Sequence, residues 1–239
     1  METILKFKSD LKALNILLSE KQEQQFLDYY YMLVEKNKVM NLTAITDFEE
    51  VLCKHFVDSL ALIYVISLNQ RIKIIDVGTG AGFPGLPLKI AFPDLDIVLA
   101  DSLNKRVGFL NDVIHELKLE NTIAVHGRAE ELGQDTRFRE QFDYCVSRAV
   151  ANLAVLTEYC LPFVKVGGQF ISYKSGHSIE EIEASKRAVR ILGGRIGDIK
   201  DYYLPSTVIS RALICIDKVE KTNKKYPRRA GIPRKEPLV

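Results

Sequence analysis

The fold of this chain is decided by the stretch Ile74-Ile75-Asp76-Val77-Gly78-Thr79-Gly80-Ala81-Gly82-Phe83-Pro84-Gly85-Leu86-Pro87-Leu88. A short apolar run is followed by a carboxylate, three alternate glycines, a fourth glycine and two prolines, and apolar spacing then resumes. This order predicts a buried strand, a tight turn and a helix. Glycine accepts a positive φ and, because it lacks Cβ, lets a ligand lie against the backbone. We therefore expect a ligand pocket floored by backbone amides at this turn.

Two classes of ligand compete for that pocket. The spacing Gly80-x-Gly82-x-x-Gly85, with Asp101 downstream, fits the dinucleotide fingerprint. The longer pattern that begins at Asp76 and runs through Gly78, Gly80 and Gly82 resembles motif I of class I methyltransferases, which bind S-adenosylmethionine. A pyrophosphate gains nothing from a nearby carboxylate, whereas a ligand with an ammonium and a sulfonium does. The stretch therefore favours a methyl donor over a nicotinamide cofactor.

Length and composition limit the class of protein. A chain of 239 residues with 47% apolar residues can form one α/β domain with a modest appendage. No apolar run approaches a membrane span, and the first ten residues lack the apolar core of a signal peptide. The four cysteines form no C-x-x-C pair, which argues against a structural zinc and a disulfide scaffold. We expect a monomeric cytoplasmic protein with no metal and no membrane association.

Charge is unevenly distributed along the chain. The net charge is only +2, yet residues 217–239 carry eight basic residues against three acidic ones, a net charge of +5. A basic tail on a near-neutral body suggests a polyanionic partner, because each phosphate that Lys or Arg neutralises releases condensed counterions. A solvated tail that only aids solubility is an equally good reading of the charge run by itself.

The remaining pattern predicts two regions that form one compact unit. Residues 1–66 show helical apolar spacing and are expected to be an N-terminal helical extension, and residues 67–239 form the main domain. There we expect strands at 72–77, 96–101, 122–126, 142–147, 168–173, 195–203 and 208–219, and helices near 85–92, 104–118, 134–140, 152–163 and 178–192. This alternation predicts a doubly wound α/β sheet whose last strand, in a final hairpin, is antiparallel.

Ligands of open α/β sheets bind beyond the carboxyl ends of the strands. Asp101, at the end of the second strand, suits either the ribose hydroxyls or the start of the next helix, and we favour ribose. After the third strand, Ala129 and Glu130 are candidates to contact adenine. At the ends of strands four and five, Arg148 and Lys174 would place two cations beside the methyl acceptor, where they suit a phosphate or a guanine O6.

Other basic residues are candidates for RNA contacts. Lys105 and Arg106 begin a predicted helix, where the helix dipole disfavours cations, so an anionic partner is one explanation and an ordinary exposed helix face is the other. Arg228 and Arg229 belong to the basic tail.

Taken together, these segments resemble the RsmG family, also called glucose-inhibited division protein B. The resemblance covers nearly the whole chain and rests on 41–45, 55–60, 76–88, 101–110, Ser147-Arg148-Ala149 and 226–233. It implies a class I methyltransferase that uses S-adenosylmethionine to methylate N7 of a guanine in the decoding-region loop of 16S ribosomal RNA, free or in the small subunit. It also implies that Gly78, Phe83, Ala129, Glu130 and Arg148 contact the cofactor, which gives Arg148 two candidate roles.

The residues at the end of the fourth strand agree with guanine N7 as the methyl acceptor. Ser147-Arg148-Ala149 is neither the Asp/Asn-Pro-Pro-aromatic box of amine methyltransferases nor a cysteine nucleophile motif. Guanine N7 has an in-plane lone pair and no proton to remove, so its methylation requires no general base. Catalysis is expected to come from alignment and electrostatics, with Arg148 and Lys174 as positioning groups.

Three other functions are compatible with parts of the sequence. A small-molecule methyltransferase would explain the glycine stretch but not the basic tail. An RNA-binding assembly factor with a vestigial cofactor site is disfavoured because Asp76, the glycines and Asp101 are intact. A nicotinamide oxidoreductase would bind NAD and not S-adenosylhomocysteine.

Overall fold

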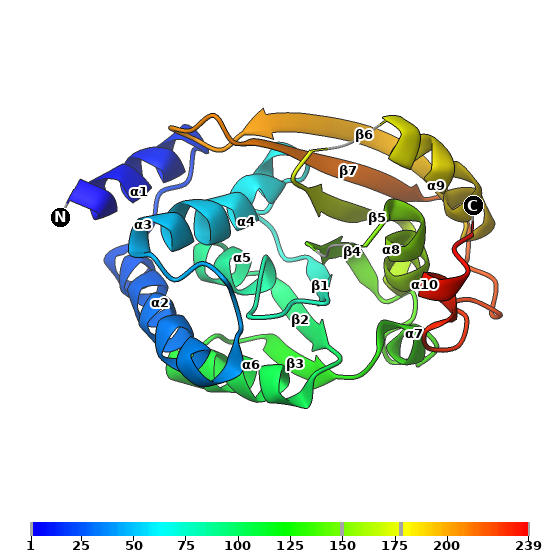
Figure 1. Cartoon of the computed structure of the whole chain (residues 1–239), viewed down its shortest axis with the longest axis horizontal. Coiled ribbons are helices and arrows are strands. Elements are labelled where there is room, and N and C mark those ends of the chain that lie inside the picture. Colours follow the sequence, from blue (N-terminus) through cyan, green and yellow to red (C-terminus); the bar gives the residue numbers. More distant parts are fainter. Residues whose placement is uncertain (1, 149–150, 177–178, 239) are drawn as a thin grey trace.

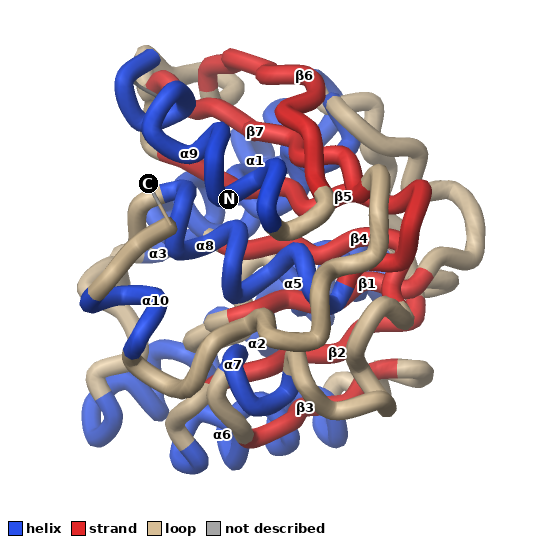
Figure 2. The backbone as a smooth tube through the Cα atoms, turned by 90° about the vertical axis from the view of Figure 1, so that its right-hand side faces the viewer, coloured by secondary structure: helices blue, strands red, loops and turns tan. Residues whose placement is uncertain are grey.

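A computed structural model of the chain describes residues 2–148, 151–176 and 179–238. The described residues form one sheet of seven strands in the order β3-β2-β1-β4-β5-β7-β6, which Figure 2 shows from β3 at the bottom to β6 at the top. The strands are β1 Lys73–Val77, β2 Asp96–Asp101, β3 Thr122–His126, β4 Phe142–Ser147, β5 Val164–Lys174, β6 Gly194–Tyr203 and β7 Ser210–Lys218. The first five are mutually parallel, whereas β7 pairs antiparallel with β5 and with β6. The predicted doubly wound sheet with an antiparallel last strand is confirmed.

Helices lie on both faces of this sheet (Figure 1). The α-helices are α1 Glu2–Ala13, α2 Glu20–Met40, α3 Phe48–Val51, α4 Asp58–Leu60, α5 Gly85–Ala91, α6 Asn104–Glu116, α7 Ala129–Leu132, α8 Leu153–Cys160, α9 Ile179–Ile191 and α10 Ile232–Lys235. A π-helical segment, η1 (Leu52–Val57), joins α3 to α4, and two 3-10 segments follow α4 and α8, namely η2 (Ala61–Tyr64) and η3 (Leu161–Phe163). Within the described residues, no helix is both long and apolar enough to cross a membrane.

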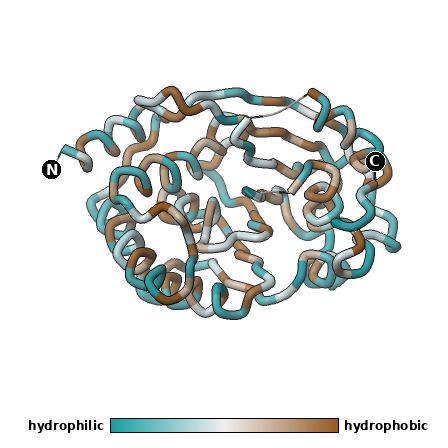
Figure 3. Tube along the Cα trace, in the orientation of Figure 1, coloured by the Kyte–Doolittle hydropathy of each residue, from teal (hydrophilic) through white to brown (hydrophobic). Residues whose placement is uncertain are grey.

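The sheet divides the interior into two hydrophobic cores, because successive strand residues point to opposite faces. Ile74 belongs to the core under α2, α5 and α6, and its neighbour Ile75 belongs to the core under α8 and α9. In β4, Val146 belongs to the same core as Ile74, and Cys145 belongs to the same core as Ile75. Figure 3 shows hydrophobic and hydrophilic stretches alternating along the elements, as amphipathic helices on a sheet require.

The N-terminal helices pack directly on the glycine stretch. Phe26 and Tyr29 of α2 and Phe56 of η1 are fully buried in the same core as Ile74. The rings of Tyr29 and Phe56 lie 5.6 and 6.1 Å from the ring of Phe83. Tyr29 also donates a 2.6 Å hydrogen bond from Oη to the Ala81 carbonyl. The N-terminal helices therefore share one core with the sheet and help to position the loop.

One predicted helix is wrong. Residues 134–140 form turns, and the only helical turn between β3 and β4 in the described structure is α7, several residues earlier. The carboxylate of Asp135 accepts from the backbone and the side chain of Arg137, and Glu140 has a φ of +55°. An aspartate that bonds the backbone two residues ahead favours a turn over a helix.

Candidate active site

Two buried carboxylates hold the glycine loop that follows β1. Asp76 Oδ2 accepts hydrogen bonds from Thr79 Oγ1 (2.6 Å) and from the Gly85 amide (2.8 Å), so it fastens both ends of the loop. Asp101 Oδ2 accepts from the Gly80 amide (2.9 Å), and its Oδ1 accepts from the Leu103 amide (2.9 Å) at the start of α6. Both carboxylates therefore accept hydrogen bonds from the protein itself. Contact of Asp101 with ribose stays a prediction.

The sequence predicted that free backbone amides of this loop would line the ligand pocket, and this prediction is wrong for most of the loop. The amides of Gly78 and Thr79 donate to the Ala100 carbonyl, Gly80 donates to Asp101, and Gly82 and Phe83 donate to the Thr79 carbonyl. Because a pyrophosphate requires converging free amides, this loop is poorly suited to a dinucleotide. The surface it offers is the Cα edge of the glycines.

Beside the loop lies a pocket of about 420 Å³, within the usual range for small-molecule sites, and Gly78 is the loop glycine that lines it. Gly78, Ala100, Ser102, Ala129 and Glu130 line it together with Ser147 at the end of β4. Gly80 adopts a φ of +63°, and a Cβ added there would have no protein atom within 4 Å. Gly82 is different, because an added Cβ would lie 2.3 Å from Leu86 Cδ1. Gly80 thus borders open space, although it is not among the residues that line this pocket, whereas Gly82 allows close packing of the loop.

A nucleoside-bearing ligand with a cationic end fits this pocket. Asp76 Oδ1 is buried without a hydrogen-bond partner in the described structure. Burial raises the pKa of Asp76 to about 7, against the hydrogen bonds from Thr79 and Gly85. A cation beside the loop would favour the ionised carboxylate. The residues present therefore suit S-adenosylmethionine, whose methyl group is electrophilic because of its sulfonium.

The opposite wall of the cofactor pocket comes from the C-terminal segment, which we define as residues 219–238. Gly231, Arg234 and Lys235 line the pocket, and the Gly231 amide donates a 2.9 Å bond to Glu130 Oε1. Figure 1 shows α10 beside α7 and α8. Glu130 thus holds this wall in place through its carboxylate.

Arg228, a predicted RNA contact, pairs with a buried carboxylate inside the protein, and its contact with RNA stays a prediction. Its Nε and Nη2 lie 2.9 and 2.7 Å from the two oxygens of Glu158, and its amide also donates to Glu158 Oε1. The Glu158 side chain is only 1% exposed, so this pair is structural. Arg139 adds four donations to carbonyls, including those of Thr222 and Tyr226. Arg229 is exposed, and its contact with RNA stays a prediction.

The predicted cations at the start of α6 differ from each other. Arg106 Nη1 lies 3.4 Å from Asp101 Oδ2 and supports the loop acid, so its cation already has a partner inside the protein. Lys105 is exposed. RNA contact therefore remains a prediction best supported at Lys105.

A second, larger cavity adjoins the first at Ala151, which lines both. This acceptor pocket has a volume of about 670 Å³. Arg148 and Lys174, at the ends of β4 and β5, both line it, and their contact with a methyl acceptor stays a prediction. Lys174 Nζ is held by Glu181 Oε1 (2.7 Å) and by the Ala151 carbonyl (3.0 Å).

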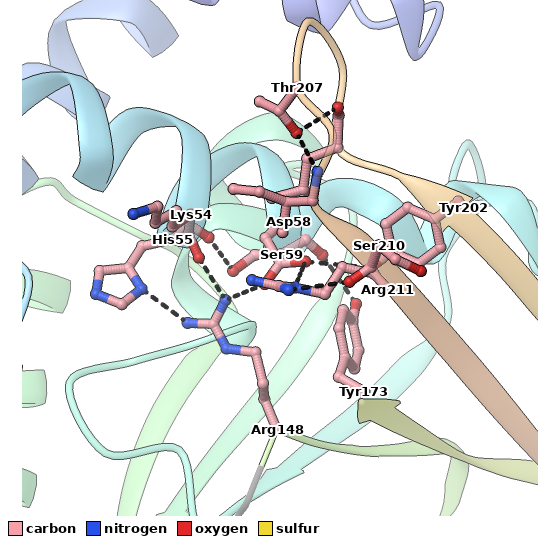
Figure 4. Close-up of polar contacts among 12 residues, drawn as sticks. Lys54, His55, Asp58, Ser59, Arg148, Tyr173, Tyr202, Thr207, Ser210 and Arg211 are labelled. Atoms are coloured by element: carbon pink, nitrogen blue, oxygen red, sulfur yellow. Dashed lines mark hydrogen bonds and ion pairs between the residues drawn. The ribbon is translucent and has the colours of Figure 1, made fainter. Parts of the chain in front are cut away.

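Arg148 is anchored from several directions, as Figure 4 shows. Its Nη1 donates to Asp58 Oδ2 (3.1 Å) and to the Lys54 carbonyl (3.3 Å). Its guanidinium carbon lies 5.0 Å from the centre of the Phe83 ring. Phe83, expected to contact the cofactor, therefore supports Arg148 and is not among the residues that line the cofactor pocket. Arg148 lines the larger cavity and not the cofactor pocket, and both of its candidate roles stay predictions.

His55 is fixed as a neutral ring between Arg148 and Thr43. Arg148 Nη2 lies 3.3 Å from His55 Nδ1, and Thr43 Oγ1 lies 2.8 Å from Nε2. Burial and the neighbouring guanidinium lower the pKa of His55 to about 3. A guanidinium can only donate, so Nδ1 accepts and the proton resides on Nε2.

Two residues of this pocket were missed. Asp58 is buried and accepts from Arg148, and the Nε of Arg211 lies 3.4 Å from Asp58 Oδ1. Asp58 belongs to the family-like segment 55–60, which was a usable signal, whereas Arg211 lies in no motif. Among the described residues no cluster of three metal-ligating side chains occurs. Ala149 of the fourth-strand motif lies outside the described residues.

Comparison with known proteins identifies the family of this chain. Residues 22–202 match the profile of the family described as rRNA small subunit methyltransferase G. The chain is 53% identical to Ribosomal RNA small subunit methyltransferase G of Lachnoclostridium phytofermentans over 98% of this chain and 96% of that protein. It is 51% identical to the Alkaliphilus metalliredigens protein of the same name over the full length of both.

Among solved structures, the Methanococcus jannaschii fibrillarin pre-rRNA processing protein has a similar fold. The TM-score is 0.52 at 18% identity, covering 67% of this chain and 74% of that one. Matches across nearly the whole sequence at half identity establish the family. The chain therefore belongs to the rRNA small subunit methyltransferase G family.

Proposed function

We propose that this protein transfers the methyl group of S-adenosylmethionine to N7 of a guanine in the decoding-region loop of 16S rRNA. The observation that carries the proposal is the pair of adjoining pockets at the carboxyl edge of the sheet. One is bounded by the glycine loop, and the other is lined by Arg148 and Lys174. The names of the relatives supply the RNA class.

The residues of the chain account for binding and alignment. An added Cβ at Gly78 or Gly80 would meet open space, which supports a close approach of the cofactor to the loop. Ala129 and Glu130 line the same pocket as Gly78, which supports their proposed contact with adenine. Arg148 lines the acceptor pocket, where its positive charge favours RNA beside the shared wall at Ala151.

Proton transfer is not part of the proposed step. His55 stays neutral, and its Nδ1 already accepts from Arg148. Guanine N7 has no proton to lose, so alignment is the main contribution of the protein.

Two measurements test the proposal. Calorimetry should show binding of S-adenosylhomocysteine and none of NAD. Mapping of N7-methylguanine in 16S rRNA should show one site that is lost in cells lacking the protein and restored by the wild-type chain. An unchanged methylation map, or transfer to a different guanine atom, would refute the proposal.

A further inference from the structure

The acceptor pocket contains a charge cluster that the alignment of a guanine does not explain. Asp58, 4% exposed, is contacted by two guanidinium groups and by the Tyr202 hydroxyl. Arg148 Nη1 lies 3.1 Å from Oδ2, Arg211 Nε lies 3.4 Å from Oδ1, and Tyr202 Oη donates to Oδ1 at 3.2 Å. Figure 4 shows both arginines converging on this carboxylate from different strands.

The fold brings Arg211 here because β7 runs opposite to its neighbours. The antiparallel pairing of β5 with β7 matches Lys174 with Ala212. The beginning of β7 therefore lies at the edge where the parallel strands end. Arg211 and Arg148 consequently share one cavity although 63 positions separate them in the sequence.

The arginine pair, Arg148 and Arg211, carries one positive charge more than Asp58 can balance. The other cations that line the cavity have carboxylates of their own, Glu50 for Lys54 and Glu181 for Lys174. His55 contributes no charge because its Nδ1 accepts from Arg148. The excess charge of the acceptor pocket is therefore concentrated on the arginine pair.

Arg211 still has hydrogen-bond donors to offer. Its Nε is directed to Asp58 and its Nη1 donates to the Ser210 carbonyl, while no described residue accepts from its Nη2. Its side chain is 20% exposed at the cavity wall. Arg148, by contrast, uses both terminal nitrogens inside the protein.

We propose that the Nη2 edge of Arg211, backed by Arg148 and Asp58, binds a backbone phosphate of the RNA strand next to the target guanine. This inference rests on the proposed function. Methylation at N7 makes the guanine ring positive, so a second cation at the base would oppose the product, whereas a phosphodiester is already anionic. An arginine fork also matches phosphate oxygens in geometry.

The salt dependence of RNA binding tests this inference. We compare full-length wild type with Arg211→Gln, which keeps an amide donor near Asp58 but loses the charge, and with Arg211→Lys, which keeps the charge. Arg211→Gln should lower the slope of log Kd against log salt for 16S rRNA by about 0.7, the value for one phosphate on a single strand. KM for RNA should rise about tenfold, the cost of one charge-assisted hydrogen bond, with kcat nearly unchanged. Arg211→Lys should retain the wild-type slope.

A matched control separates a local effect from a general loss of charge. Arg195 of β6 also pairs with an aspartate, Asp217, but its side chain is 73% exposed and lies outside the cavity. Arg195→Ala should leave the slope and KM unchanged, and every variant should keep the wild-type affinity for S-adenosylhomocysteine.

The outcomes distinguish this inference from the proposed function. If the wild type methylates N7 and Arg211→Gln keeps its slope and KM, the phosphate site is wrong while the activity stands. A fall in kcat at an unchanged slope would assign Arg211 to the base and equally overturn the inference. A wild type that binds no 16S rRNA would overturn both.

Discussion

At the scale of single residues, the cofactor loop depends on buried carboxylates more than on its glycine amides. Asp76 and Asp101 accept the loop donors at Gly85, Thr79 and Gly80. The glycines contribute open space or close packing, according to position.

Gly80→Ala is expected to retain the fold and weaken cofactor binding at least tenfold. An alanine at a φ of +63° costs about 1–2 kcal/mol, and its methyl group would enter the open side of the loop. Calorimetry with S-adenosylhomocysteine measures the loss. The control is Gly108→Ala in α6, where an added Cβ also meets nothing within 4 Å and the backbone is helical. Equal affinity for Gly80→Ala and Gly108→Ala would remove Gly80 from the site.

Asp76 should make stability fall as pH rises. Burial raises its pKa from an ordinary value of 3.8 to about 7 in the folded chain, so the unfolded chain loses this proton at lower pH. The stabilisation is complete below pH 4 and is lost as pH rises through 7, by up to about 1.4 kcal/mol per pH unit. Asp76→Asn should lack this decline in denaturant unfolding between pH 4 and 7. Parallel curves for variant and wild type would contradict the assignment.

At the scale of elements, the two ends of the chain complete the pockets. The π-helical segment η1 directs the Lys54 carbonyl and the His55 ring toward Arg148, in keeping with the frequent use of π-helical turns at functional sites. The C-terminal segment closes the cofactor pocket through Gly231 and its bond to Glu130.

Arg228→Ala is expected to weaken cofactor binding even without RNA. It leaves the carboxylate of Glu158 buried and unpaired, which costs roughly 3 kcal/mol, the lower end for a buried pair because Arg228 is partly exposed. The segment that lines the pocket should then detach, lowering both the free energy of unfolding and the affinity for S-adenosylhomocysteine.

Arg229→Ala is the matched control for Arg228→Ala, because the neighbouring residue is exposed. It should leave stability and cofactor affinity unchanged and weaken RNA binding in a salt-dependent manner. Identical behaviour of the two variants would contradict the separate roles assigned to these arginines.

At the scale of the whole molecule, both pockets lie at the carboxyl edge of one sheet. Helices from the N-terminal region pack on the glycine loop and share its core. Among the described residues that line the acceptor pocket, the one imidazole does not titrate near neutral pH. His55, the buried imidazole beside Arg148, has a pKa of about 3 and remains neutral at any physiological pH.

The kcat for methyl transfer should accordingly be flat between pH 6 and 8 at saturating cofactor and RNA. Radiolabel transfer to 16S rRNA at constant ionic strength measures it. A limb with a midpoint in this window that persists in Asp76→Asn, which removes the loop acid with a pKa of about 7, would show that another protein group exchanges a proton in the rate-limiting step.

The sequence by itself determined the sheet, the glycine loop and the strand-end residues Arg148 and Lys174, because apolar period, turn chemistry and strand ends are local properties of the chain. Only the tertiary structure decided what the charges do. Arg228 pairs with Glu158, and Arg211 with Asp58, across 70 and 153 positions. Charge composition made the tail a candidate RNA contact, but a partly exposed Arg228 pairs with the buried carboxylate of Glu158, which gives it a structural role. Which cation meets which anion depends on how strands far apart in sequence are aligned, and no local pattern records that alignment.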